Sequence, residues 1–475
     1  MMFTREKLLV LGTHNPEALV DSILGFQEQV QSLTERIEQL EQQLRKNSRN
    51  SSKPPSSDGP AKPNPKSLRK RTGKKSGGQK GHEGHTLQRV EHPDQSTVLP
   101  VNVCSCHADL SQISPIGYDV RQIFELPEPK LDVLEFKGEI KICPDCGAQV
   151  KAIFPDSVKA PVQYGERFRA LLVYLHHQQL LPVNRINQMM QDLYNAPVCE
   201  ATILDVAKRT HGNLEPFEIA ITQDLCKSPV LHVDESGART AGKLHWLHVA
   251  STEFLTFYAI HEKRGAEAID SFDILPQFNG CLIHDFWKPY LKYECYHGLC
   301  NAHHLRELTF LFEQQNQPWA KKMFDFLLEA RKFTKEQNEQ LTLEQKEPWI
   351  KRYRNIIAEG WEANPLPPEP VKKKRGRRKK TKSQNLLERL CEYESSVLAF
   401  LHDKNVPFSN NLAEQDIRMI KIRLKISGCF RTLQGAKQFA RIRSYISTAR
   451  KQAWNILDAI TSAVVGLPYI PSICQ

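Results

Sequence analysis

The sequence predicts an α/β core, in which helices flank a mixed β-sheet, together with a large α-helical insertion, an N-terminal coiled coil and a small cysteine-rich module. Three observations favour this fold class. A heptad pattern occupies the N-terminal region, two cysteine pairs bracket a short segment after it, and β-prone runs alternate with helical periodicity after Pro229. With 475 residues, the chain is long enough for about three domains.

The charge of the chain indicates a polyanionic partner. There are 65 Lys and Arg against 54 Asp and Glu, a formal net charge of +11, and the excess is concentrated in particular segments, as in proteins that bind nucleic acid. No apolar run approaches the ~20 residues needed to cross a bilayer, and Leu8–Leu11 is too short for the core of a signal peptide. We therefore expect a cytoplasmic protein with no membrane partner.

Residues 15–46 are expected to form a coiled-coil helix. Apolar positions alternate steps of three and four, as in a heptad repeat, and Asn15 followed by Pro16 suits a helix start. The repeating positions are Phe26, Val30, Leu33, Ile37, Leu40 and Leu44. A single amphipathic helix that packs on its own domain is the alternative, because only about three heptads are sustained. We favour a helix that pairs with a second copy.

Residues 47–95 are expected to form a basic, disordered linker. Ser, Pro, Gly, Asn and Lys dominate its first part, and such a composition cannot bury a core. Arg69, Lys70 and Arg71 would also bind DNA phosphates and release counterions. The two roles are compatible.

Residues 96–155 have the pattern of a small zinc-finger-like module. Its predicted zinc ligands are Cys104, Cys106, Cys143 and Cys146. The second pair is spaced so that both thiolates can meet one tetrahedral Zn²⁺, and Gly147 permits the tight turn. The first pair has an unusual spacing, and Cys104 with His107 is a better-spaced alternative; a metal-free module is a further one. Short strands are expected at 121–127 and 131–140.

Residues 160–228 show helical periodicity, and Asn195-Ala196-Pro197 separates two of the helices. A helix-turn-helix that reads DNA and plain α-helical packing both fit this pattern. Periodicity alone does not distinguish them, because it does not reveal a recognition face.

Residues 229–312 are expected to form the first part of the core. Three strands, a helix and then strands that alternate with helices follow one another, which is the order of a ribonuclease-H-like sheet. In such a sheet the first strand, 230–234, and the fourth, 281–285, lie side by side. A helical insertion is expected at 313–404, with a basic loop at 371–382, and a helical return to the core at 405–470.

Three carboxylates are placed where they could share a metal site. Asp234 and Asp285 end the first and fourth β-prone runs, and Glu414 lies on a predicted helix. Neighbouring strands would make the two aspartates face one point, where two divalent ions ~3.5–4 Å apart could activate an attacking oxygen and stabilise a leaving oxygen in phosphoryl transfer. The alternatives are turn or N-cap roles for the aspartates, and a capping box that joins Asn411 to Glu414.

Several motifs in this order resemble transposases of the Insertion Sequence Sixty-Six type, which have a DDE ribonuclease-H-like core. The motifs lie at residues 47–58, 77–82, 232–237, 284–290, 300–306 and 410–414, with the leucine-zipper-like start and the cysteine module. The resemblance implies that Asp234, Asp285 and Glu414 bind two Mg²⁺ or Mn²⁺ ions and are catalytic. It further implies DNA as partner, both transposon terminal inverted repeats and target DNA, in a homodimer or higher oligomer associated with the bacterial nucleoid.

The resemblance also bears on residues outside the triad. Arg418 and Lys421 follow Glu414 by one and two helical turns and are expected to bind DNA near the metals. Cys300, His303 and His304 resemble the family's C-x-x-H element, for which zinc binding, packing and DNA positioning are alternatives. The family's cysteine module begins C-x-x-C, whereas Val103 occupies that first place here.

The basic loop adds three candidate DNA contacts, Arg375, Arg377 and Arg378. Its Arg-Gly-Arg centre resembles a minor-groove AT-hook without the proline, and a disordered loop that binds phosphates is the alternative. The function expected from the whole sequence is metal-dependent cleavage at transposon ends and strand transfer into target DNA. A catalytically inactive or domesticated sequence-specific DNA-binding protein is the alternative.

Overall fold

The computed structural model describes residues 16–47, 49–51, 86–337, 339–366 and 380–472. It divides into two units, a small unit of residues 66–135 and a main unit that holds residues 1–65 and 136–475. Where it is described, residues 86–135, the small unit contains a bridge between Val103 and Asp109 and no regular helix or strand. The strand predicted at 121–127 is therefore wrong. Ile123 is 89% exposed there, and alternating apolar residues cannot form a strand without a partner strand.

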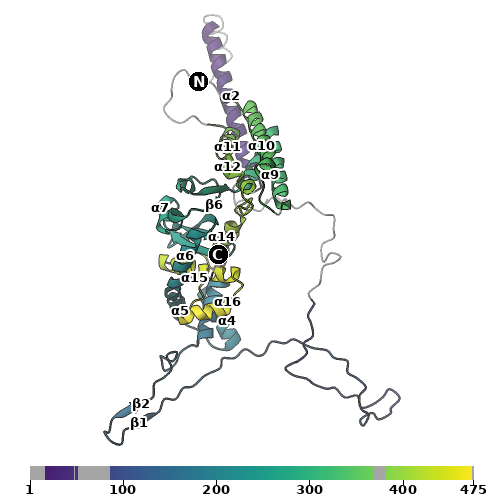
Figure 1. Ribbon diagram of the computed structural model, residues 1–475, viewed down its shortest axis with the longest axis vertical. Helices are drawn as coiled ribbons and strands as arrows, with labels where there is room; N and C mark the ends of the chain where they lie inside the picture. The colour runs from purple at the N-terminus through teal and green to yellow at the C-terminus, as the bar shows by residue number, and fades with distance from the viewer. Residues whose placement is uncertain (1–15, 48, 52–85, 338, 367–379, 473–475) are drawn as a thin grey trace, which may run out of the picture. The chain divides into compact units, whose positions relative to one another are not determined.

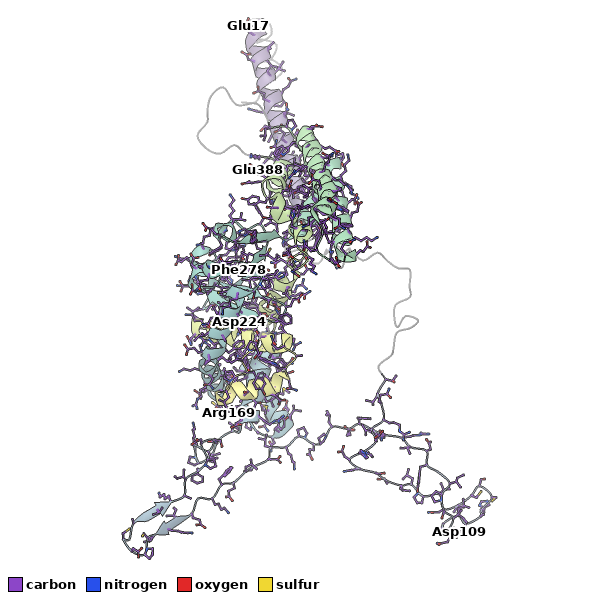
Figure 2. The ribbon with its side chains drawn as sticks, in the orientation of Figure 1. Glu17, Asp109, Arg169, Asp224, Phe278 and Glu388 are labelled. Carbon is purple, nitrogen blue, oxygen red and sulfur yellow. The ribbon has the colours of Figure 1, made fainter. Side chains whose placement is uncertain are left out.

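The main unit begins with the long helix α2, Pro16–Leu44. Its heptad positions are exposed, with Phe26 and Leu33 each 63% accessible. Figure 2 shows the side chains of α2, from Glu17 onwards, standing out from a single helix. The predicted helix is confirmed, and its pairing with a second helix stays a prediction.

After α2, the described part of the main unit resumes with a short hairpin. Its strands are β1, Ile140–Ile142, and β2, Gln149–Lys151, which pair antiparallel. The strand predicted at 131–140 is wrong except for its last residue.

A helical segment then leads into the sheet, as predicted for 160–228. Asn195 adopts the left-handed conformation that ends α4 (φ 49°), at the predicted break. The elements are α3 (Glu166–Val173), the π-helix η2 (Tyr174–Gln178), α4 (Val183–Tyr194), α5 (Glu200–Asn213) and α6 (Glu215–Lys227).

Five strands form the central sheet in the order β5-β4-β3-β6-β7. Strands β3, β4 and β5 are antiparallel neighbours, whereas β6 and β7 run parallel to β3. The first and fourth strands are thus adjacent, as expected. Elements of this region are β3 (Val230–Thr240), β4 (Lys243–Ser251), β5 (Thr256–His261), α7 (Ala266–Ser271), η3 (Leu275–Gln277), β6 (Cys281–His284), η4 (Lys288–Lys292) and β7 (Tyr296–Leu299).

Both faces of the sheet are covered. On one face, Leu231 and Val233 of β3 pack in a buried cluster with Phe217 and Ile221 of α6. On the other face, Ala238 packs with residues of α14 (Asn411–Ile426) and α15 (Leu433–Lys451). The last helix is α16, Ile456–Val465. Because side chains alternate along a strand, Asp234 points to the α14 face and Glu235 to the opposite one.

The predicted insertion is a helical bundle with its own buried core, between β7 and α14 (Figure 1). Two of its helices begin with a capping box, in which Thr342 pairs with Gln345 and Thr381 with Gln384. The helices of the insertion are α9 (Pro318–Glu336), α10 (Leu343–Ala363), α11 (Lys382–Glu392), α12 (Glu394–Val397) and α13 (Ala399–His402). Helix α8 (Asn301–Gln315), predicted as the end of the first part of the core, packs in the same buried cluster. Among the described helices, none combines the length and apolar character that a membrane span requires.

Candidate active site

Asp234 and Asp285 lie at matching positions of two adjacent strands, Asp234 within β3 and Asp285 directly after β6. The parallel pairing sets His232 opposite Ile283, so Asp234 and Asp285, two residues further along each chain, share the position and the face of the sheet. Asp234 lies inside β3 and not in a turn. Asp285 follows β6 directly, and its Oδ1 accepts a hydrogen bond from the Trp287 backbone N–H at 3.2 Å. Asp285 therefore also stabilises a turn, which was the alternative role considered for it.

Glu414 reaches this end of the sheet from the first turn of α14, which packs on β3 and β4. Asn410 anchors that turn. Its Nδ2 donates to the Val233 carbonyl at 2.7 Å, and its Oδ1 lies 2.9 Å from His232 Nδ1. The N-cap is Asn410, without a side-chain cap hydrogen bond, so the capping box between Asn411 and Glu414 is wrong.

The three carboxylates act on one another electrostatically. Burial raises the pKa of Asp234 well above its usual range, and the charges of Glu235, Asp285 and Glu414 raise it further. Burial likewise raises the pKa values of Asp285 and Glu414, and Asp285 adds to the shift of Glu414. A cluster of buried carboxylates that repel one another is unfavourable unless cations neutralise it.

This arrangement fits two hard divalent cations. Asp234 Oδ1 accepts a hydrogen bond from the Glu235 N–H at 2.8 Å, and the buried Oε1 of Glu414 has no hydrogen-bond partner. Among the described residues, the triad is not a group whose ligand atoms all lie within 4.8 Å of one another. In a two-ion site, with ions ~3.5–4 Å apart, each ligand need not reach both ions.

Basic side chains surround the carboxylates. Arg306 of α8 and Arg418 of α14 lower the pKa of Glu414, and Asp234 acts on the pKa of Lys421. Lys421 also donates to the Gly237 carbonyl at 3.3 Å. Arg418 and Lys421 thus lie beside the triad, and their binding of DNA stays a prediction; Arg306 was not among the predicted DNA contacts. The other predicted DNA contacts, Arg69, Lys70, Arg71, Arg375, Arg377 and Arg378, lie outside the described residues.

A second buried carboxylate, not predicted as a site residue, lies on the other face of β3. The side chain of Glu235 is 2% exposed and forms an ion pair with Arg264 at 2.5 Å. Tyr290 donates its hydroxyl to Glu235 at 2.5 Å. The Arg264 guanidinium lies 4.8 Å from the Trp246 ring and 4.3 Å from the Trp287 ring. The sequence signals for this network are two: the adjacent acids Asp234 and Glu235, and the aromatic residues of segment 286–290.

The predicted C-x-x-H element also meets the triad. Cys300, His303 and Glu414 form a group whose ligand atoms lie within 4.8 Å of one another. His304 is turned to a different partner, since its Nδ1 lies 3.0 Å from Asn301 Oδ1. It is buried, and burial lowers its pKa well below the usual range. The structure therefore separates the two adjacent histidines.

The predicted zinc cysteines divide between the two units. Cys104 and Cys106 belong to the small unit, and Cys143 and Cys146 to the main unit. Within each pair, hydrogen bonds from the second cysteine lower the pKa of the first. Donors of that kind favour a thiolate, the form that binds zinc. The four-cysteine site stays a prediction.

Comparison with known proteins gives two family matches. The model described as "Transposase IS66 family" matches residues 161–438, which is more than half of the 475 residues and includes the three carboxylates. A family of unknown function, DUF6444, matches residues 10–88. A search of curated proteins found no match. On the extent of the first match, the chain belongs to the IS66 family of transposases.

Proposed function

We propose that this protein cleaves DNA at the ends of a mobile element and joins the freed 3′-hydroxyls to target DNA. Asp234, Asp285 and Glu414 would hold two Mg²⁺ or Mn²⁺ ions on a ribonuclease-H-like sheet. The observation that carries the proposal is the convergence of three partly buried carboxylates, from β3, from the residue after β6 and from α14; Asp285 and Glu414 raise the pKa of Asp234, and Asp285 raises that of Glu414. The family supports transposition as the purpose of that chemistry.

The divalent ions, when bound, supply an activated oxygen nucleophile and stabilise charge that develops on the leaving oxygen. The chain's part is to hold the three carboxylates in place for the ions. Asn410 ties the start of α14 to Val233, the residue before Asp234, by a hydrogen bond, which holds the helix that carries Glu414 against the strand. Arg418 and Lys421 would hold phosphates at the same end of the sheet.

The DNA partners would be the terminal inverted repeats and the target. The charge of +11 favours binding to a polyanion. The exposed apolar heptad positions of α2 favour its pairing with the same helix of a second chain. Zinc at the four cysteines would order the N-terminal module.

The test is cleavage of a duplex that carries a transposon end. Asp234→Asn, Asp285→Asn and Glu414→Gln should each reduce Mg²⁺-dependent cleavage by about 10³-fold or more while DNA binding persists. Glu253→Gln, at an exposed position between β4 and β5, is the control that should cleave normally. Normal cleavage by all three variants would refute the triad. A wild-type protein that shifts the DNA without cutting it would support the inactive DNA-binding alternative.

A further inference from the structure

A second metal-binding arrangement adjoins the triad. Cys300 precedes α8 at its N-cap, His303 lies in the first turn of α8, and Glu414 lies in the first turn of α14. One ligand atom of each lies within 4.8 Å of the ligand atoms of the other two. We propose that Cys300, His303 and Glu414 bind one Zn²⁺ ion, which is distinct from the divalent ions of DNA cleavage.

Two unsatisfied atoms face each other at this site. His303 Nδ1 and Glu414 Oε1 are 3.9 Å apart, which is too long for a hydrogen bond. Both atoms are buried, and neither has a hydrogen-bond partner in the described structure. Unpaired buried polar atoms are costly and rare. Two ligand atoms that each lie ~2.0–2.2 Å from one ion are at most about 4 Å apart, so a single ion could satisfy both.

The donor set selects zinc over magnesium. A thiolate, an imidazole and a carboxylate are the ligands of zinc sites, whereas Mg²⁺ prefers oxygen ligands and water. With Cys300 as a thiolate and Glu414 ionised, the two negative charges would balance the charge of Zn²⁺. Three protein ligands leave the fourth tetrahedral position open to water or to a DNA phosphate oxygen.

The fold holds the cysteine in place for this role. Cys300 is 2% exposed, and its Sγ accepts a hydrogen bond from the Asn410 backbone N–H at 3.2 Å. The Cys300 N–H donates to the His284 carbonyl at 2.9 Å. Asn410 therefore links the cysteine to the turn that carries Glu414. The zinc ion would join α8 to α14 at the point where the helical insertion meets the core.

The inference goes beyond the proposed function, although the two sites share Glu414. A carboxylate has two oxygens, so a zinc bound through Oε1 leaves Oε2 for the cleavage site. Zinc would then fix the orientation of Glu414, as a positioning element for the triad, and it would do so before DNA binds.

The experiment measures zinc per chain in the purified full-length protein by mass spectrometry after dialysis. Cys300→Ser and His303→Gln should each contain one zinc fewer than wild type. Cys281→Ser is the matched control, because Cys281 is also a buried free cysteine but belongs to β6 and to a different cluster. The difference between variants is independent of zinc at the four N-terminal cysteines.

A second readout uses Co²⁺ in a full-length background that lacks the four N-terminal cysteines. The thiolate-to-cobalt absorption band should be present with Cys300 and absent in the added Cys300→Ser variant. Equal zinc in wild type, Cys300→Ser and His303→Gln would overturn the proposal, as would an equal loss in Cys281→Ser. If Cys300→Ser does not fold, His303→Gln and the cobalt band of the parent still decide.

The two proposals can fail separately. Asp234→Asn and Asp285→Asn should retain the zinc and lose cleavage, whereas Glu414→Gln should lose both. Zinc in a protein that never cleaves DNA would leave the zinc site standing and refute the proposed function. Cleavage by a protein without this zinc would do the reverse.

Discussion

Asp234 and Glu235 are neighbours on β3, yet their surroundings differ on the two faces of the sheet. Burial raises the pKa of both carboxyls. Glu235 has the guanidinium of Arg264 and the hydroxyl of Tyr290 as partners. Asp234 has a backbone N–H as its hydrogen-bond donor and faces two further carboxylates.

The difference in partners identifies Glu235 as a structural carboxylate and Asp234 as a candidate metal ligand. Burial and a raised pKa are common to both residues, so neither property identifies the site. What distinguishes Asp234 is that no ion pair compensates its charge among the described residues, although Lys421 lies near enough to interact with it; such a charge is tolerated where an ion or a substrate will neutralise it. Arg264 supplies that compensation on one face, and we propose that metal ions supply it on the other.

The largest expected effect is on the Glu235 face. Arg264→Gln leaves Glu235 buried without its cation and should lower the free energy of unfolding by about 2–4 kcal/mol. The loss is smaller than for a wholly buried pair because the Arg264 side chain is 40% exposed. Urea unfolding of metal-free protein measures it. An unchanged midpoint would mean that the pair does not stabilise β3.

Glu235→Gln should destabilise by about 2 kcal/mol, since a neutral amide accepts weaker hydrogen bonds from Arg264 and Tyr290 than a carboxylate does. The same urea titration measures the change. If Glu235 were instead a metal ligand, this variant would lose Mg²⁺-induced stabilisation, which we expect it to keep.

Asp234→Asn should have the opposite sign. The substitution removes a buried charge and its repulsion with Asp285 and Glu414, so metal-free protein should gain about 0.5–2 kcal/mol at neutral pH. Stabilisation by Mg²⁺ should disappear in this variant. A loss of stability in Asp234→Asn would contradict the distinction between the two faces.

The difference in stability between wild type and Asp234→Asn should depend on pH. The pKa of Asp234 is higher in the folded state than in the unfolded chain, so the folded state binds this proton more tightly. Its contribution is therefore fully present below ~pH 3.9 and is lost as pH rises through the raised pKa. Unfolding of both proteins in chelator at several pH values measures it. The stability gained by Asp234→Asn over wild type should be small at acid pH and should increase as pH rises; a gain that shrinks as pH rises would have the wrong sign.

The smallest effect on stability is expected for Arg418→Gln. Arg418 is exposed, so its loss should change the free energy of unfolding by at most about 0.5 kcal/mol. Binding to a transposon-end duplex should weaken, and the dependence of affinity on salt should become shallower by about one phosphate contact. The contrast with Arg264→Gln compares the same substitution on the two faces. A large loss of stability would show that Arg418 is structural.

The local pattern of the sequence predicted most of the helices and strands of the core. Alternation and periodicity located β3, β4, β5 and β6, and the break at Asn195, because these signals depend on neighbours in the chain. The same logic failed at residues 121–127, where a β-prone segment has no strand to pair with among residues 86–135. Pairing is a property of two segments, and one segment does not encode it.

By itself the sequence determined which residues are candidates: three acids at the ends of predicted elements, and a cysteine and histidines spaced along one helix. Only the tertiary structure decided their neighbours. It gave Glu235 an ion pair and, among the described residues, gave Asp234 none, turned His304 towards Asn301, and brought His303 to 3.9 Å from Glu414. The physical reason is that charge compensation and ligand geometry depend on distances in space between segments that are far apart in the chain.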